Sequence, residues 1–210
     1  MIKVYGMPDT RSTRVLWVLE EANADYEFIK VDLGKGEARE ESYLKLNPSG
    51  KVPTLIHDDL VLTESAAICT YIGDLFPDSN LIPACRTSER AIYNQWCYFA
   101  MTELEQPLWS MAKHRFALPK EYRIREMLIT ANYEFDKALD VFSLRLSDSE
   151  FLVGDRFTCA DLIVANILSW AKRGGKRAMS LRHDNIEQYL ERMLSREAFL
   201  RVQKREQEVL

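Results

Sequence analysis

Strand-like patterning is confined to the first third of this chain. Apolar and polar residues alternate in several short runs up to about residue 63, and the pattern then disappears. All seven prolines lie at or before position 119, and the later part has the spacing of amphipathic helices. These two textures predict a mixed α/β part followed by an all-helical part. The length of 210 residues fits two domains of modest size.

The first part has the element order of a thioredoxin-like domain. Residues 2–5 and 26–31 are predicted as strands, and residues 13–22 between them as a helix. Such a β-α-β unit has a right-handed crossover, so its two strands are expected to be parallel. A short helix, a tight hairpin and a longer helix follow, over residues 40–46, 54–56 with 60–62, and 65–76. The expected order is therefore β-α-β-α-β-β-α.

The second part is predicted to be helical throughout. A helix over residues 89–114 contains Pro107, which is expected to kink or split it. A second long helix is expected to start at Pro119 and to run to about residue 146. Thr158 and Asp161 have the spacing of a capping box before the next helix. Two short helices are expected at the end, over residues 185–194 and from residue 196 on.

Residues 77–87 separate the two parts. They contain two prolines together with Asp78, Ser79 and Asn80, a composition typical of a linker. We therefore divide the chain into a thioredoxin-like domain of residues 1–80, a linker of residues 81–87 and an all-helical domain of residues 88–210.

Charge and hydropathy argue against several classes of partner. Lys and Arg number 28 against 32 Asp and Glu, so the formal charge of −4 disfavours nucleic acid and anionic membranes as partners. The one basic concentration, over residues 172–182, is interpreted as a solvated helix end and loop. The start of the chain has no signal-peptide pattern, and no apolar stretch approaches the roughly 18 residues that span a membrane. We expect a cytoplasmic protein.

The four cysteines fit neither a metal site nor a disulfide framework. Cys69, Cys85, Cys97 and Cys159 are scattered, without CxxC or His-rich spacing. Structural zinc sites need closely spaced thiol and imidazole ligands, and disulfide scaffolds are small and rich in cysteine. We therefore expect reduced thiols, mostly buried in helices, and no metal.

Residues 47–65 are the clearest candidate for a binding site. Pro53 has no N–H to donate, so its place beside a predicted strand marks an edge, a bulge or a cis turn. The backbone of Val52 is then expected to be partly unpaired and able to pair with an extended peptide. Ser65, at the first turn of a helix, offers a hydroxyl and free N–H groups to an anion, and Glu64 offers a carboxylate to an ammonium. The segment thus predicts a pocket for a small peptide with a free α-amino acid head.

Four stretches together resemble the cytosolic glutathione S-transferase superfamily. They occur in the order of that superfamily and span the chain: residues 12–21 (STRVLWVLEE), 47–55 (NPSGKVPTL), 63–68 (TESAAI) and 151–161 (FLVGDRFTCAD). The resemblance implies an α/β thioredoxin-like N-terminal domain, an all-α C-terminal domain and a homodimer. It also implies that glutathione binds as co-substrate, beside a hydrophobic site for a small electrophile.

The resemblance assigns five residues to glutathione binding. Val52 and Pro53 match the family's cis-proline turn, where the valine backbone pairs with the cysteinyl part of glutathione. Glu64 and Ser65 match the pair that holds the γ-glutamyl amino and carboxylate groups, and Lys51 matches a position that in several classes reaches the glycine carboxylate. Taken singly, these residues also have structural interpretations, as a helix cap, a partner of the helix dipole and a rigid turn. Together, in this fold, they favour binding.

The residue that would activate the thiol departs from the family pattern. A thiol with a pKa of about 8.5 is largely protonated at neutral pH, so a donor at the start of the first helix must stabilise the thiolate. Bacterial and fungal serine-type members carry a serine four residues before the position of Arg14, and this chain has Thr10 there. The extra methyl restricts its rotamer. We predict Thr10 as the first catalytic candidate and Ser12 as the second, and we interpret Tyr5 as a strand aromatic.

Two functions follow from this sequence. The leading one is a transferase that conjugates the glutathione thiolate to small electrophiles, with glutathione peroxidase activity as a second reaction. Residues 9–12 contain no cysteine, which disfavours dithiol exchange and mixed-disulfide chemistry. The alternative is a non-catalytic interaction or regulatory protein with the same fold, motivated by Thr10 in place of serine. The second-substrate pocket is expected to draw on a cluster in the helical part: Trp109, Met111, His114, Arg115 and Phe116.

Overall fold

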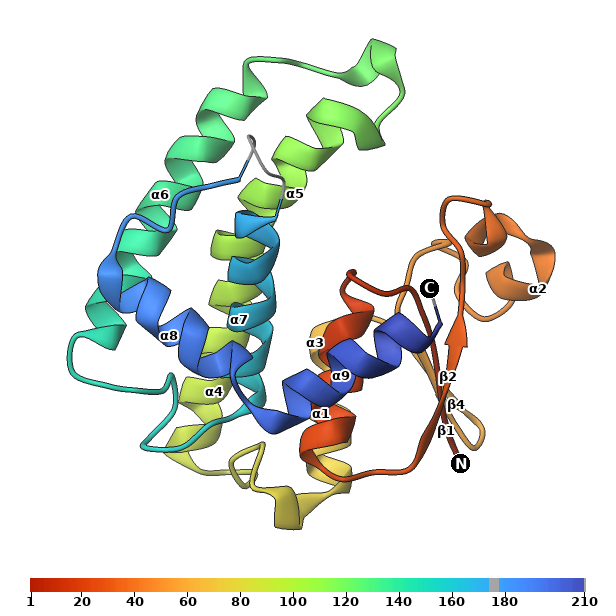
Figure 1. Ribbon diagram of the computed structural model, residues 1–210, viewed down its shortest axis with the longest axis horizontal. Helices are drawn as coiled ribbons and strands as arrows, with labels where there is room; N and C mark the ends of the chain where they lie inside the picture. The colour runs from red at the N-terminus through yellow and green to blue at the C-terminus, as the bar shows by residue number, and fades with distance from the viewer. Residues whose placement is uncertain (174–177, 210) are drawn as a thin grey trace. The chain divides into compact units, whose positions relative to one another are not determined.

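The chain forms two compact units, traced in Figure 1. The structure is a computed structural model, and it describes residues 1–173 and 178–209. The N-terminal unit comprises Met1–Ile82 together with the C-terminal residues from Leu194 on, and the helical unit comprises Pro83–Met193. The final helix therefore packs with the first unit, whereas the sequence pattern groups it with the helical part.

The N-terminal unit is built on a single sheet of four strands. Its strands are β1 (Ile2–Gly6), β2 (Tyr26–Lys30), β3 (Thr54–His57) and β4 (Leu60–Leu62). They lie in the order β2-β1-β3-β4. β1 and β2 are parallel, as the β-α-β pattern predicts, and the other two pairs are antiparallel. The thioredoxin-like arrangement predicted from the sequence is confirmed.

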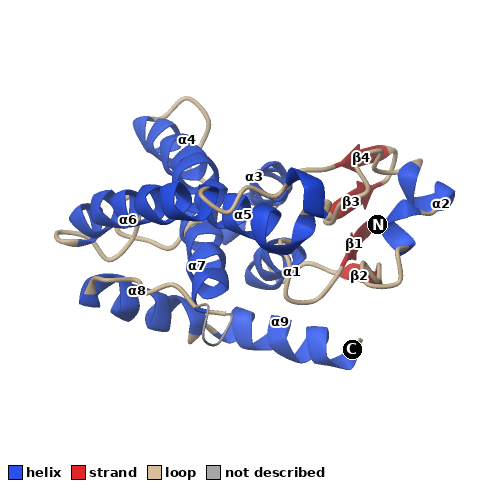
Figure 2. Cartoon of the chain, turned by 90° about the horizontal axis from the view of Figure 1, so that it is seen from above, coloured by secondary structure: helices blue, strands red, loops and turns tan. Residues whose placement is uncertain are grey.

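Helices cover both faces of this sheet. α1 (Ser12–Glu21) and α3 (Ser65–Leu75) lie on one face, and the short α2 (Glu41–Leu44) lies on the other (Figure 2). Side chains alternate along a strand, so neighbouring residues of β1 serve different faces. Val4 is fully buried, and Tyr5 points to the opposite face, where its ring lies 6.3 Å from that of Tyr43 in α2.

The C-terminal helix α9 (Glu197–Glu208) is fixed to α1 by rings and ion pairs. The rings of Trp17 and Phe199 lie 4.6 Å apart. The buried carboxylate of Glu20 accepts hydrogen bonds from Arg201 at 2.8 Å and from Arg205 at 2.6 Å. These contacts make α9 part of the N-terminal unit and bury the outer side of α1.

The helical unit begins with one long run of helix. It consists of α4 (Ser88–Phe99), a π-helical stretch (Ala100–Glu105), α5 (Gln106–Ala112) and a second π-helical stretch (Lys113–Ala117). Pro107 lies in the first turn of α5, directly after the first π-helical stretch. The expected interruption at Pro107 therefore takes the form of a change in helix type.

The prediction that a long helix starts at Pro119 is wrong. Pro119 has extended backbone and precedes only a short 3-10 turn, Lys120–Tyr122, while α6 spans Met127–Leu146. Arg123 ends the preceding run, because its guanidinium donates to the carbonyls of Leu118 and Phe116, both at 2.8 Å. The backbone between Pro119 and α6 is therefore held by the end of the earlier helix.

Two further helices complete the helical unit. α7 (Cys159–Lys172) begins with the predicted capping box of Thr158 and Asp161, which is confirmed. α8 (Asp184–Leu194) follows a segment that starts at Ala178; four positions of the basic concentration, 174–177, lie outside the described residues. Within the residues that the structure describes, no helix has the length and apolar character needed to cross a membrane.

Candidate functional site

The turn before β3 is held by buried polar side chains. The peptide bond between Val52 and Pro53 is cis. The carbonyl of Lys51 accepts two hydrogen bonds, from Nδ2 of Asn47 at 2.7 Å and from the hydroxyl of Tyr43 at 2.6 Å. Burial raises the pKa of Tyr43, so this hydroxyl keeps its proton and donates at neutral pH. The turn therefore has its shape before any ligand arrives.

The same turn leaves main-chain groups available. Among the described residues, Val52 makes no backbone–backbone hydrogen bond. Its side chain is half-buried against the small core cluster of Val31, Ala38 and Tyr43 beneath α2. Lys51 is exposed on the surface beside it. An extended peptide that reached this turn would find an unpaired N–H and C=O held in place by a packed side chain.

The start of α3 combines a strained backbone with a buried hydroxyl. Glu64 has φ +66° and ψ +106°, a conformation that residues other than glycine rarely adopt, and its side chain is exposed. Such strain persists where the surrounding structure requires it, and it is frequent at ligand sites. Ser65 is 3% exposed, and its Oγ accepts a hydrogen bond from Nη1 of Arg14 at 3.1 Å.

The two candidate catalytic hydroxyls have different surroundings. Oγ1 of Thr10 donates to the carbonyl of Met7 at 2.7 Å and accepts from the N–H of Ser12 at 3.1 Å. Thr10 is half-exposed, whereas Ser12 is fully buried. Oγ of Ser12 accepts from the N–H of Met7 at 3.2 Å and lies 3.0 Å from Oγ1 of Thr10. A methyl group on Gly6 would lie 2.6 Å from the Ser12 hydroxyl, so glycine at position 6 makes room for it.

These three segments meet at one end of the sheet. The register pairs Tyr5 with Thr54, so the turn of Val52 and Pro53 lies beside the end of β1 and the loop to Thr10. It also pairs Leu55 with Leu62, which brings the end of β4 and the start of α3 to the same place. Arg14 then joins α1 to α3 through Ser65.

Three residues that organise this end of the sheet were not predicted as site residues. Arg14 is 1% exposed, and Asn47 and Tyr43 are 4% and 5% exposed. The available signal for Arg14 was an arginine directly before the apolar run of residues 15–19. Asn47 and Tyr43 gave no comparable signal, because their partners are a carbonyl and a hydroxyl that only the folded turn brings close.

A cavity in the helical unit contains part of the predicted second-substrate cluster. It measures about 230 Å³ and is lined by Leu108, Met111, Ala112, Arg115, Phe116, Trp170, Ala171, Arg173 and Met179. Trp109 and His114 are not among the described residues that line it. Nδ1 of His114 instead accepts a hydrogen bond from the N–H of Ile124 at 3.0 Å, which is a structural role. Met111, Arg115 and Phe116 are the members of the cluster that reach the cavity.

Comparison with known proteins gives a consistent result. The sequence matches the model for the glutathione S-transferase N-terminal domain over residues 1–74 and that for the C-terminal domain over residues 106–197. Glutathione S-transferase F11 of Arabidopsis thaliana is 34% identical over 169 residues, which cover 77% of this chain and 78% of that protein.

Solved structures agree with these matches. A glutathione transferase from Methylococcus capsulatus superposes with a TM-score of 0.86 at 32% identity, covering 98% of both chains. The glutathione transferase URE2P8 from Phanerochaete chrysosporium, solved with oxidised glutathione, has a TM-score of 0.83 at 25% identity and covers 99% of this chain and 96% of that chain.

Proposed function

The chain belongs to the glutathione S-transferase family, and we propose that it is an active enzyme that transfers the glutathione sulfur to a small electrophile. One observation carries the proposal: the loop of Thr10, the turn of Val52 and the start of α3 meet at one end of the sheet. These are the segments that a γ-glutamyl tripeptide needs, namely a hydroxyl for its thiol, a free backbone for its cysteinyl part and an anion site for its head.

We propose the following roles for the five binding residues. The backbone of Val52, set by the turn at Pro53, pairs with the cysteinyl residue of glutathione. The first N–H groups of α3 and the hydroxyl of Ser65 bind the γ-glutamyl carboxylate, because helix N-termini favour anions. The exposed carboxylate of Glu64 binds the γ-glutamyl ammonium, and Lys51 binds the glycine carboxylate. The positive φ of Glu64 supports the role given to its carboxylate, since this backbone conformation directs the side chain away from the path that it would follow in a helix.

For activation, we propose Thr10 as the donor and Ser12 as the residue that positions its loop. The Thr10 hydroxyl is half-exposed, and rotation away from the Met7 carbonyl lets it donate to the sulfur. The thiol proton passes to solvent, the sulfur lone pair attacks the electrophilic carbon, and the leaving group departs with the electrons of the broken bond. This assignment makes the chain a serine-type member in which threonine supplies the hydroxyl. Reduction of hydroperoxides, with a second glutathione giving the disulfide, is the second proposed reaction.

The alternative, a non-catalytic glutathione-binding or interaction protein, has a specific observation in its favour. The Thr10 hydroxyl is committed to the Met7 carbonyl at 2.7 Å, and the Ser12 hydroxyl is buried. In this version neither hydroxyl reaches a bound thiol. The two functions differ in turnover, not in fold.

The test combines retention on immobilised glutathione with conjugation of 1-chloro-2,4-dinitrobenzene. We expect retention and turnover, with kcat/KM lowered about 10- to 100-fold in Thr10→Ala and largely kept in Thr10→Ser. Ser12→Ala is expected to lower stability more than the rate, because the N–H of Met7 loses its acceptor. Retention without turnover would support the non-catalytic alternative, and failure of both would refute the glutathione proposal.

We further propose that the protein is a homodimer that uses an exposed apolar row on α6. Ile129, Tyr133, Val141 and Leu144 are 75%, 62%, 50% and 74% exposed, at spacings that place them along one side of the helix. Exposed apolar patches of this kind mark interaction surfaces. Sedimentation should give a dimer for the wild type and a folded monomer for the double variant Ile129→Lys, Leu144→Lys. An unchanged dimer in that variant would place the interface elsewhere.

A further inference from the structure

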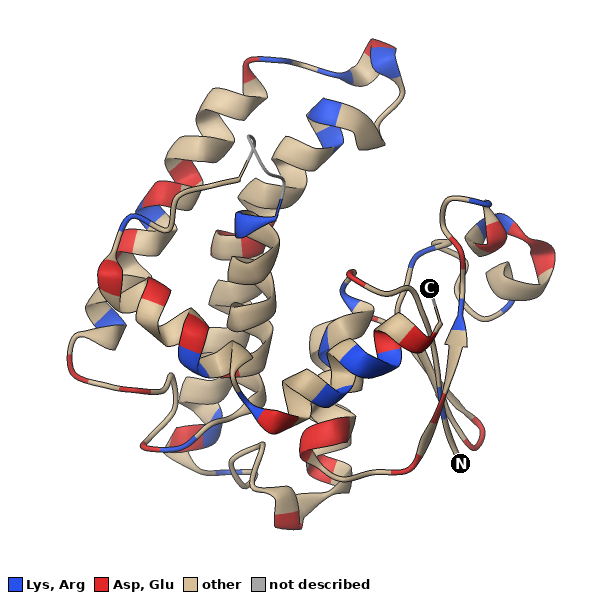
Figure 3. Cartoon of the chain, viewed as in Figure 1, with Lys and Arg blue, Asp and Glu red and all other residues tan. Residues whose placement is uncertain are grey.

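The cavity of the helical unit combines apolar walls with positive charge. Leu108, Met111 and Ala112 form its buried floor, and Phe116, 65% exposed, stands at its edge. Arg115 and Arg173 are the charged residues that line it, and no Asp or Glu occurs among its described lining residues. Figure 3 shows basic residues at the ends of both α5 and α7. The local charge is thus positive in a chain whose formal charge is −4.

The wall that carries Arg115 and Phe116 is held in place from behind. Arg123 donates to the carbonyls of Leu118 and Phe116 at 2.8 Å and to that of Arg115 at 3.3 Å. His114 accepts the N–H of Ile124 at 3.0 Å. The segment itself is a π-helical turn, a feature found frequently at functional sites. A cationic side chain on such a fixed turn is available to a ligand at low entropic cost.

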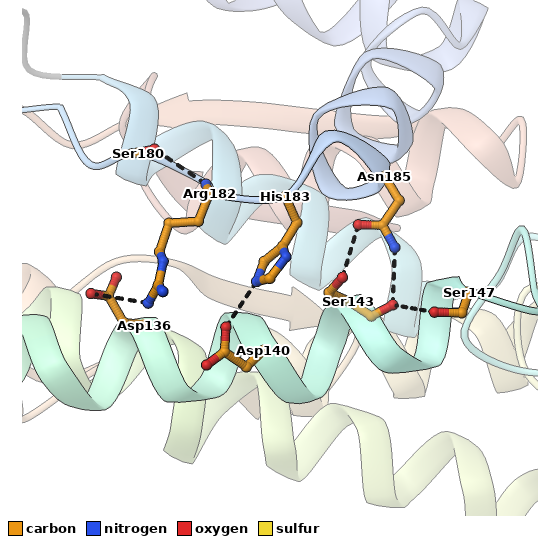
Figure 4. A network of polar contacts seen from close by, with 8 residues as sticks. All are labelled: Asp136, Asp140, Ser143, Ser147, Ser180, Arg182, His183 and Asn185. Atoms are coloured by element: carbon orange, nitrogen blue, oxygen red, sulfur yellow. Dashed lines mark hydrogen bonds and ion pairs between the residues drawn. The ribbon is translucent and has the colours of Figure 1, made fainter.

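The opposite wall is fixed by a polar network. The N–H of Met179 donates to the carbonyl of Ala171 at 2.8 Å, which ties this part of the lining to the end of α7. Figure 4 shows how the following residues are joined to α6 by the pairs His183 with Asp140, Arg182 with Asp136, and Asn185 with Ser143. Hydrogen bonds and ion pairs therefore hold the backbone of both walls in place, so the cavity has its shape before a ligand binds.

Arg115 and Arg123 differ in how they are used. The guanidinium of Arg123 donates hydrogen bonds to three carbonyls, whereas the guanidinium of Arg115 makes no hydrogen bond or ion pair with any described residue. Arg115 is only half-exposed, and a charge that is partly removed from water is stabilised by an opposite charge. An anionic group at Arg115, joined to an apolar body lying on Met111 and Trp170, satisfies both features of the cavity.

We propose that this cavity binds small apolar molecules that carry an anionic group, such as aryl carboxylates or sulfonates, with Arg115 as the anion-binding residue. We assign this class of molecules as the second substrate of the transferase, and this assignment rests on the proposed function. The binding statement itself needs no glutathione.

The first test uses two fluorescent probes with the same aromatic body, 1-anilinonaphthalene-8-sulfonate and the neutral N-phenyl-1-naphthylamine. Without glutathione, Arg115→Met should raise the Kd of the sulfonate about 10-fold or more and change that of the neutral probe less than about twofold. Phe116→Ala should weaken both probes. Arg125→Met is the matched control, because Arg125 is exposed and is not part of the lining; it should change neither Kd.

Each other outcome overturns the proposal. An unchanged sulfonate Kd in Arg115→Met, with the fold intact by circular dichroism, would remove Arg115 as the anion site. Equal weakening of both probes would reduce its role to apolar packing. Absence of sulfonate binding to the wild type would remove the cavity as a site for such anions.

The second test addresses the substrate assignment through 4-chloro-3-nitrobenzoate and its neutral amide. Arg115→Met should lower kcat/KM with glutathione about 10-fold for the benzoate and less than about twofold for the amide. Equal losses for the two would refute the substrate class. If neither compound is turned over by the wild type while the sulfonate probe still binds through Arg115, the proposed function fails and the anion site stands.

Discussion

The two candidate sites of this protein differ in the residues that form them: buried polar side chains in one, and apolar side chains with arginines in the other. At the end of the sheet, the polar side chains of Asn47, Tyr43 and Arg14 are buried. Asn47 and Tyr43 donate to the Lys51 carbonyl, and Arg14 donates to the Ser65 hydroxyl, so that other backbone groups of the turn stay available. In the helical unit the cavity is lined by apolar residues such as Leu108 and Met111, together with two arginines, Arg115 and Arg173. Under the functions proposed above, the first arrangement binds a single peptide, and the second binds a class of molecules selected by charge and shape.

This comparison predicts where changes affect stability and where they affect binding. A polar residue of the sheet-end site contributes to both, because the same hydrogen bonds shape the backbone that binds. A buried polar residue of the helical unit lies outside the cavity lining and contributes to stability alone.

Asp161→Ala should have the largest effect on stability. The carboxylate is fully buried and accepts from the N–H groups of Leu152 and Thr158, both at 2.9 Å, and from the hydroxyl of Tyr189 at 3.0 Å. Its removal leaves buried donors without a partner, so we expect a loss of about 4 kcal/mol in the free energy of unfolding. Urea denaturation measures it, and Asp148→Ala, an exposed aspartate of the same unit, should change it by less than about 0.5 kcal/mol. Sulfonate binding per folded molecule should persist, and its loss would break the separation of stability from binding.

The capping box of Asp161 also shows what the sequence predicts well. Thr158 and Asp161 are three residues apart, and their interaction depends only on local backbone, as does the parallel pairing within a β-α-β unit. Features made by distant partners were not predictable. Glu206 of α9 accepts a hydrogen bond from Thr13 at 2.6 Å across a separation of 193 residues. The sequence pattern also did not predict that the exposed arginines of α9, Arg201 and Arg205, bind Glu20 of α1. The helix start predicted at Pro119 was wrong because proline is common in the first turn of a helix, and the sequence pattern does not show that Arg123 caps the end of the preceding helical run.

The sheet-end site shows the same limit. The motif of residues 47–55 predicted a turn, and the structure adds the reason, since Asn47 binds the carbonyl of Lys51 and accepts from Ser49. The positive φ of Glu64 had no signal in its residue type, because glutamate is not a residue that favours that conformation. Local chemistry was therefore predictable, and the geometry imposed by packing was not.

Asn47→Ala should lower both stability and glutathione affinity. Nδ2 is one of two donors to the Lys51 carbonyl, and Oδ1 accepts from both the N–H and the hydroxyl of Ser49. We expect a loss of about 2 kcal/mol in the free energy of unfolding, together with a raised Kd for glutathione by calorimetry. Ser49→Ala separates the contributions: it removes only the exposed hydroxyl that donates to Oδ1 and keeps both the N–H of Ser49 and the bond from Nδ2 to Lys51, so its effect on either quantity should be small. A variant with normal glutathione affinity despite lowered stability would show that the turn does not shape the binding backbone.

Glu20→Gln should have a somewhat smaller effect, which depends on pH. Burial raises the pKa of Glu20, but hydrogen bonds from Arg201, Tyr26 and Arg205 outweigh it and hold the pKa below the ordinary value of 4.5. A carboxyl whose pKa is lower in the folded state contributes its stability above the ordinary pKa and loses it as the pH falls through the folded value. We expect a loss of about 1 to 2 kcal/mol at pH 7, discounted because the arginines are partly exposed. The difference from wild type should shrink in acid, as the pH falls below the ordinary pKa of 4.5 and through the lower pKa of the folded state.

The control for Glu20 is a surface pair in the same unit. Glu27 lies 3.2 Å from Lys3, and the two side chains are 51% and 41% exposed, so Glu27→Gln should cost less than about 0.5 kcal/mol. A pH-independent difference between wild type and Glu20→Gln would mean that shape, and not charge, holds α9 on α1.

The smallest signal is expected from thiol labelling of the native protein, which reports how readily each unit unfolds locally and exposes its buried cysteines. Cys85 is exposed, whereas Cys69 in the N-terminal unit and Cys97 and Cys159 in the helical unit are buried. Burial also raises the pKa of Cys97 to about 11, so its thiolate is scarce at neutral pH. Native protein should release one equivalent of thionitrobenzoate from Ellman's reagent, none after Cys85→Ser, and four after unfolding of the wild type. Slow additional labelling at Cys97 and Cys159 before Cys69 would mean that the helical unit opens first, which would contradict a cavity formed in advance of its ligand.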